Sequence, residues 1–179
     1  FMGKVLKKKT AVAGDEVTYS LMLRQMQKAV AIQHKGIASR HAYSMDGIDY
    51  YCGIRDEDIG ILRQKYDVII LDISFENTFD NTNVTFARMV SRLSACDEKI
   101  LAGSMLPWKS RECEKKMERI ERFLDIRGLK MVTLAACDKE AVSIIKKHGV
   151  EVVLIPFERN PFVISGENLR SFLELLKIT

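Results

Sequence analysis

The sequence lacks the features that mark several large classes of protein. Its 179 residues contain no apolar run near the roughly 20 residues that cross a bilayer. The four cysteines are widely spaced without a C-x-x-C pair, and the three histidines show no metal-ligand spacing. The net charge of +4 is too mild to indicate nucleic-acid binding by itself. We therefore expect a cytoplasmic protein with reduced thiols and with no strong membrane or nucleic-acid signal.

The most informative stretch that is present runs from Tyr66 to Ser74. Within it Val68–Leu71 is an unbroken, mostly β-branched apolar run, which is typical of a strand buried on both faces. Asp72 stands at the carboxyl end of this run, where open parallel α/β sheets bind their ligands. A carboxylate there holds Mg²⁺, accepts a phosphoryl group or caps the following loop.

Strand-like and helix-like segments alternate along the whole chain. Strands are predicted at 10–14, 47–52, 66–73, 99–104, 130–135 and 150–155, and helices at 20–32, 55–65, 82–94, 110–124, 138–149 and from Ser165 onward. Residues 34–44 and 74–83 are predicted as loops. This alternation predicts one α/β domain over residues 1–179, with a doubly wound, mainly parallel sheet of about six strands, strand 66–73 central, and helices on both faces.

Four motifs resemble, in order, those of P-loop NTPases of the ParA/MinD type. Tyr66–Asp72 resembles the Walker B strand, and Lys8–Val12 resembles the strand that follows the family's first helix. Ala95–Leu101 and Gly149–Phe157 resemble two later strands. The resemblance implies a three-layer fold, ATP and Mg²⁺ binding, ATP-dependent homodimerisation, and output through a protein partner. It also implies that Asp72 contributes to metal and cofactor binding.

The departures from the family concern the nucleotide site. No G-x-x-x-x-G-K-[ST] phosphate loop occurs in the sequence, so we expect the family's first strand and phosphate loop to be missing from this chain. Asp15, the second candidate for cofactor binding, is one residue out of register with the family's first switch carboxylate, and Gly14 takes the equivalent place. Phosphoryl transfer depends on phosphate positioning, so ATPase activity is expected only if such a loop lies upstream of residue 1. No residue is assigned a catalytic role.

Two other functions remain open from the sequence. One is a non-enzymatic scaffold that kept a P-loop-like fold and lost its chemistry. The other is a receiver-like phosphoacceptor domain, in which Asp15 and Glu16 would hold Mg²⁺ and Asp72 would take the phosphoryl group, with Ser104 ending a third strand. The absence of a Lys-Pro pair after the fifth strand disfavours the receiver.

Overall fold

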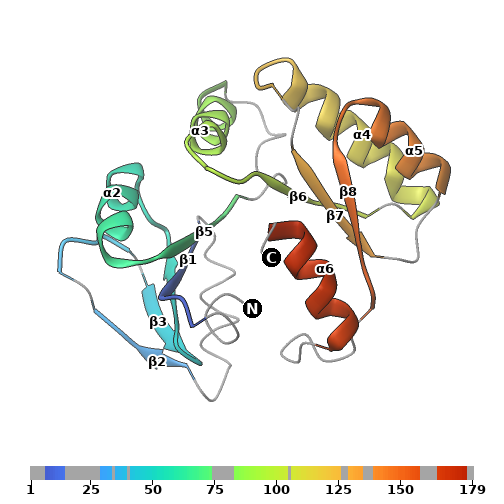
Figure 1. Ribbon diagram of the computed structural model, residues 1–179. Coiled ribbons are helices and arrows are strands. Elements are labelled where there is room, and N and C mark those ends of the chain that lie inside the picture. Colours follow the sequence, from blue (N-terminus) through green and yellow to red (C-terminus); the bar gives the residue numbers. More distant parts are fainter. Residues whose placement is uncertain are drawn as a thin grey trace. The chain divides into compact units, whose positions relative to one another are not determined.

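The computed structural model divides the chain into two compact units, residues 1–86 and 87–179, and each unit has its own sheet (Figure 1). The structure describes residues 7–14, 29–33, 35–39, 41–73, 83–104, 106–125, 129–134, 139–157 and 165–176. The predicted α/β class is confirmed by these ranges. The single domain over residues 1–179 stays a prediction.

The first unit contains a mixed sheet of five strands in the order β2-β3-β4-β1-β5. The strands are β1 (Thr10–Gly14), β2 (Val30–Ala31), β3 (His41–Met45), β4 (Ile48–Cys52) and β5 (Val68–Asp72). Strand β1 is parallel to both β4 and β5, whereas β3 is antiparallel to β2 and β4. The sheet is therefore not parallel throughout, because a hairpin forms one side of it.

The β3–β4 hairpin corrects part of the loop predicted at residues 34–44: residues 41–44 belong to β3, whereas 35–39 have no strand or helix. Met45 pairs with Ile48 across a two-residue turn, in which Asp46 and Gly47 have φ values of 53° and 76°. Two successive positive φ angles match the right-handed twist of the flanking strands, and Asp-Gly is a preferred pair for such a turn. The wrong prediction therefore came from overlooking a local turn signal beside a polar strand.

The prediction of a helix at 20–32 is wrong at the C-terminal end of this segment. Val30–Ala31 forms β2, which pairs with Tyr43 and Ser44, and the Ile32 N–H donates to the Ala42 carbonyl at 2.9 Å. The apolar residues near this end of the segment thus lie beside β3. The remainder of the predicted helix, up to residue 28, lies outside the described residues.

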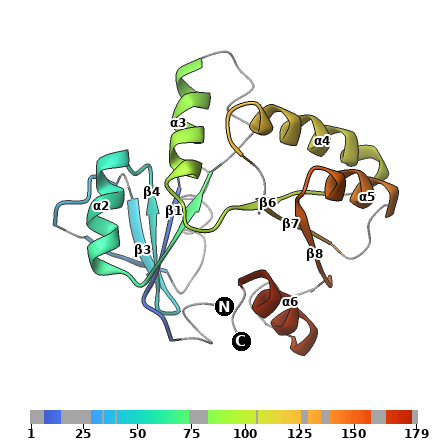
Figure 2. The same ribbon diagram turned by 45° about the horizontal axis from the view of Figure 1, so that its top comes forward.

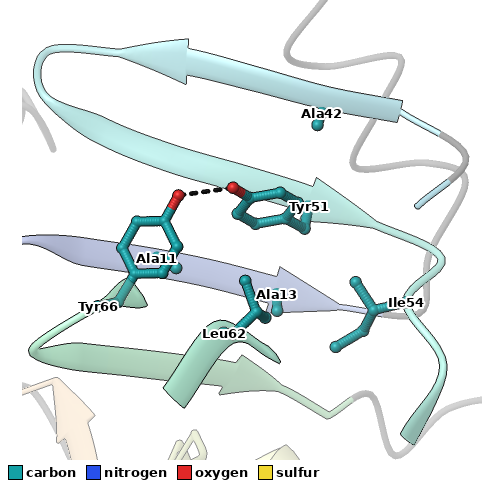
Figure 3. Close-up of a cluster of buried hydrophobic side chains, with 7 residues drawn as sticks. All are labelled: Ala11, Ala13, Ala42, Tyr51, Ile54, Leu62 and Tyr66. Carbon is teal, nitrogen blue, oxygen red and sulfur yellow. Dashed lines mark hydrogen bonds between the residues drawn. The ribbon is translucent and has the colours of Figure 1, made fainter. Parts of the chain in front are cut away.

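Helix α2 (Asp56–Lys65) covers one face of the first sheet and confirms the helix predicted at 55–65. Its buried Asp58 carboxylate accepts the N–H groups of Arg55 at 2.9 Å and Ala38 at 3.1 Å, so it stabilises the helix start and holds the segment before β3. Figure 3 shows the core that forms beneath the helix. The cluster contains Ala11, Ala13, Ala42, Tyr51, Ile54, Leu62 and Tyr66.

Strand β5 confirms the strand predicted at 66–73 but corrects its position. It pairs with β1 and lies at the edge of the five-stranded sheet, and Ile70 is 45% exposed. Ile69 and Leu71 pack against the core cluster under α2, so one face of the strand is partly buried. The expectation of a central strand buried on both faces is wrong for this sheet, because no second strand pairs with β5 within the described ranges.

The second unit contains the parallel sheet β6-β7-β8. Its strands are β6 (Ile100–Ala102), β7 (Lys130–Leu134) and β8 (Glu151–Ile155), and the helices are α4 (Pro107–Glu121), α5 (Lys139–Lys147) and α6 (Gly166–Leu176). Both views show α4 and α5 on one side of this sheet and α6 on the other (Figures 1 and 2). Helix α3 (Asn83–Ser94) spans the boundary between the units. Every strand and helix predicted in this half is present, with ends shifted by a few residues.

The core of the second unit includes the apolar stripe predicted on α4. Cys113, Met117 and Ile120 are all buried, and Lys116 pairs with Glu112 at 2.8 Å on the same helix. Gly103 lies against this stripe, since a Cβ atom there would stand 2.7 Å from Cys113 Sγ. The absent side chain at position 103 therefore allows α4 to approach the end of β6 closely.

Burial of Cys113 predicts a pH dependence of stability. Burial raises the pKa of its thiol from 9.0 to about 11, so the folded state holds the proton that the unfolded state releases first. The stabilisation is complete below about pH 9 and is lost as the pH rises towards about 11, amounting to about 2 kcal/mol. Urea unfolding of the wild type and of Cys113→Ala at pH 8 and pH 10.5 should show the wild type losing more stability by this amount. Equal losses in both proteins would contradict the assignment.

Candidate functional site

The carboxyl edge of the first sheet collects the ends of three parallel strands. The register aligns Gly14 at the end of β1 with Cys52 of β4 on one side and with Asp72 of β5 on the other. The Gly53 N–H, at a positive φ of 70°, donates to the Gly14 carbonyl at 2.8 Å and closes the β4 side of this edge. The predicted site residue Asp72 therefore lies at the edge where parallel sheets place their ligands.

Gly14 lies close to the Asp72 side chain across the pairing of β1 with β5. A Cβ atom on Gly14 would stand 3.4 Å from the Asp72 Cβ and 4.0 Å from its Oδ2. Both distances are ordinary contacts, so a larger side chain at position 14 would occupy the space beside the carboxylate. Asp72 is exposed, and among the described residues it lies beside the buried Gly14 at this edge.

The residues at this edge fit Mg²⁺ only in part. Mg²⁺ is usually held by one or two carboxylates together with waters and substrate phosphates. Asp72 supplies one carboxylate, and no group of three or more His, Cys, Asp or Glu side chains suited to a metal occurs in the described parts of the chain. Asp72 therefore fits a metal that also binds a phosphate, and it does not make a complete cation site.

Other sequence candidates are not brought to Asp72 by the described structure. Asp15 and Glu16 follow Gly14 directly but lie outside the described residues, as does most of the predicted loop at 74–83. Ser104 follows β6 and belongs to the second unit. The phosphates of ATP would need backbone N–H groups and a lysine in a glycine-rich loop, and the sequence contains no such motif. The residues present therefore do not fit the triphosphate of ATP.

The amino end of the same sheet holds a buried hydrogen-bond chain that sequence reasoning missed. Tyr66 donates its hydroxyl to Asp49 Oδ2 at 2.6 Å, so it must accept from the Tyr51 hydroxyl, also at 2.6 Å (Figure 3). Burial and then the hydrogen bond to Asp49 raise the pKa of Tyr66 above its ordinary value, and burial raises the pKa of Tyr51. Lys9 Nζ lies 5.1 Å from the centroid of the Tyr66 ring. Both phenols therefore stay protonated at neutral pH. The hydrogen bonds between Tyr51, Tyr66 and Asp49 connect β4 to the segment that leads into β5.

The carboxyl edge of the second sheet carries exposed aromatic side chains. Trp108 in the first turn of α4 is 75% exposed, and Phe157 after β8 is 73% exposed. Asn168 in the first turn of α6 is buried, and its Oδ1 has no hydrogen-bond partner among the described residues. Trp108, Phe157 and Asn168 all follow strands that end at the same edge of this sheet. The sequence analysis had named only Ser104 at this edge, as part of the receiver alternative.

Comparison with known proteins adds no relative to this picture. No family model, no curated protein and no solved structure matches the chain. None of the helices in the described ranges has the length and apolarity that crossing a membrane requires. The class defined by the structure is thus an α/β protein with an acidic residue at the carboxyl edge of a mixed sheet.

Proposed function

We propose that the chain is part of a ParA/MinD-like nucleotide-switch or regulatory protein and does not hydrolyse ATP by itself. The observation that carries the proposal is the parallel pairing of β1 with β5, which sets Asp72 beside Gly14 at the carboxyl edge. The four motifs of the resemblance support it. In the second unit, the parallel strands with helices on both faces also suit a mainly parallel, three-layer architecture.

In this proposal Asp72 orients a metal ion and does no covalent chemistry. Its carboxylate would bind Mg²⁺ directly or through a bound water, and Gly14 would leave room for the waters on that side. Mg²⁺ would supply charge neutralisation for phosphate oxygens when a nucleotide is held by residues beyond those of this chain. Output would pass through a protein partner or a homodimer.

Paramagnetic broadening by Mn²⁺, used in place of Mg²⁺, tests the metal role. In the isotopically labelled chain, Mn²⁺ is expected to broaden the amide signals of Gly14 and Asp72 strongly, and Asp72→Asn should remove most of the broadening. Asp67→Asn is the matched control, because Asp67 precedes the same strand at its other end, where it accepts the Lys9 N–H at 2.8 Å. Broadening that is unchanged in Asp72→Asn but lost in Asp67→Asn would reject the site.

The scaffold is the second candidate, and the lack of a phosphate-loop motif in the sequence favours it. A ligand that binds only the folded state must raise its stability. Thermal unfolding with and without Mg²⁺ and ATP separates the two candidates when it is run on the full-length protein. A rise in the unfolding temperature that needs both Asp72 and ATP supports the switch, whereas an unchanged temperature supports the scaffold.

A further inference from the structure

The face of the first sheet opposite α2 has an apolar cluster of its own. Ala11 and Ala13 of β1 pack beneath α2 (Figure 3), so Val12 between them belongs to the other face, because successive residues of a strand alternate. The register with β4 sets Val12 beside Tyr50. The cluster on this face consists of the buried Tyr43, Met45 and Cys52, with the partly buried Tyr50 and Ala29 packed against them.

The connection from β1 to β2 is a crossover between parallel strands. Strand β2 is antiparallel to β3, and β3 is antiparallel to β4, so β2 runs parallel to β4 and to β1. In the order β2-β3-β4-β1-β5, a chain that leaves β1 for β2 must pass β4 and β3. Residues 15–28 lie between β1 and the segment that forms β2, and they provide the dozen or more residues that such a crossover needs.

The handedness of crossovers decides over which face this connection passes. A crossover between parallel strands of one sheet is right-handed in almost every case. The chain from β4 through α2 to β5 moves along the sheet in one direction, and the chain from β1 to β2 moves in the opposite direction. Two right-handed crossovers that move in opposite directions pass over opposite faces. Because α2 covers one face, residues 15–28 belong over the other.

The end of the connection supports the same face independently of handedness. Ala29 is the first described residue after the connection, and it packs against the cluster of Tyr43, Met45 and Cys52. The sequence of the connection also supplies suitable side chains for an apolar face, because it contains Leu21, Met22, Leu23 and Met26.

We propose that residues 15–28 cover the face of the first sheet opposite α2, where their apolar side chains pack on Val12, Tyr50 and the cluster of Tyr43, Met45 and Cys52. This face is then an interface within the chain, and a protein partner or a second copy must bind elsewhere. The inference rests on strand order, register and the contact of Ala29. It does not depend on the metal role of Asp72.

Nuclear Overhauser effects (NOEs) between methyl groups test the proposal in the whole chain. With labelled Ile, Leu, Val and Met methyl groups, residues 15–28 should show NOEs to Val12 and Met45. They should show none to Ile69 and Leu71, which pack beneath α2 and serve as the internal control. A mixture of two differently labelled chains separates contacts within one chain from contacts between two copies.

The reactivity of Cys52 gives a second readout. Cys52 is 2% exposed within the cluster, and Cys113, in the second unit, is 6% exposed. Serine at positions 21, 23 and 26 removes apolar side chains from the proposed cover, so maleimide labelling of Cys52 should become about tenfold faster or more through local opening. Labelling of Cys113 should not change. The matched control places serine at the polar positions 25, 27 and 28, and it should change neither rate.

Four results would overturn the proposal. They are NOEs from residues 15–28 to Ile69 or Leu71, the absence of NOEs from these residues to Val12 and Met45, NOEs to this face that occur only between two copies, and unchanged labelling of Cys52 in the apolar triple variant. Faster labelling of both thiols would report global unfolding, and the NOEs of the unmodified chain then decide. The Mn²⁺ experiment can succeed or fail independently of all these results.

Discussion

Replacing Leu62 by alanine is expected to destabilise the first unit by about 3 kcal/mol. Leu62 lies on α2 with none of its surface exposed, and it packs among the side chains of β1, β4 and the start of β5 (Figure 3). Truncation removes buried methyl groups and leaves a cavity that the rigid strands cannot fill. Urea unfolding followed by circular dichroism measures the loss, and hydrogen exchange shows whether it falls on residues 7–73.

The control for Leu62→Ala is Gln64→Ala on the same helix. Gln64 is exposed, so its truncation should change the stability by less than about 0.5 kcal/mol. Similar losses in the two variants would contradict the role of burial beneath α2, because alanine is the best helix former and helix propensity alone predicts no loss in either variant. The metal role of Asp72 depends on this core, because the cluster includes Ala11 and Ala13 of β1, the strand paired with β5.

Replacing Lys130 by alanine is expected to cost the second unit about 3 kcal/mol. Lys130 is 1% exposed at the start of β7, and its ammonium donates to Glu98 Oε2 at 2.9 Å and to the backbone carbonyl of Leu175. That carbonyl lies in the last turn of α6, where the helix supplies no N–H partner and its dipole favours a cation. Lys130 therefore joins the parallel sheet to the end of α6.

Two further variants separate the parts of the Lys130 contribution. Lys130→Met keeps most of the aliphatic chain and removes the ammonium, so a loss of about 2 kcal/mol is expected from the Leu175 carbonyl alone. Lys146→Ala, at an exposed position of α5, is the control for loss of a positive charge. If Lys130→Met is as stable as the wild type, the buried ammonium makes no net contribution, as happens in some buried ion pairs. Increased hydrogen exchange in α6 would confirm where the loss occurs.

Local signals predicted the elements with clear caps or periodicity. The acidic first turn of α2 and the stripe on α4 were visible as patterns in the chain, and both helices formed there. Ser165 was predicted as the cap of the last helix, and its Oγ accepts the Asn168 N–H at 3.3 Å. These features depend on residues within a few positions of each other, so the sequence alone is sufficient to predict them.

Residue patterns were thus sufficient to predict the α/β class, most of the elements and the position of Asp72 at the end of a strand. Three features became apparent only in the folded chain: β5 is at the edge of the first sheet, Gly14 lies beside Asp72, and Lys130 is buried. They could not be predicted, because strand neighbours and buried partners depend on contacts between residues far apart in the sequence. Such contacts produce no periodic pattern in the sequence. An apolar run such as Val68–Leu71 indicates a strand, but it does not identify the strands that pair with it.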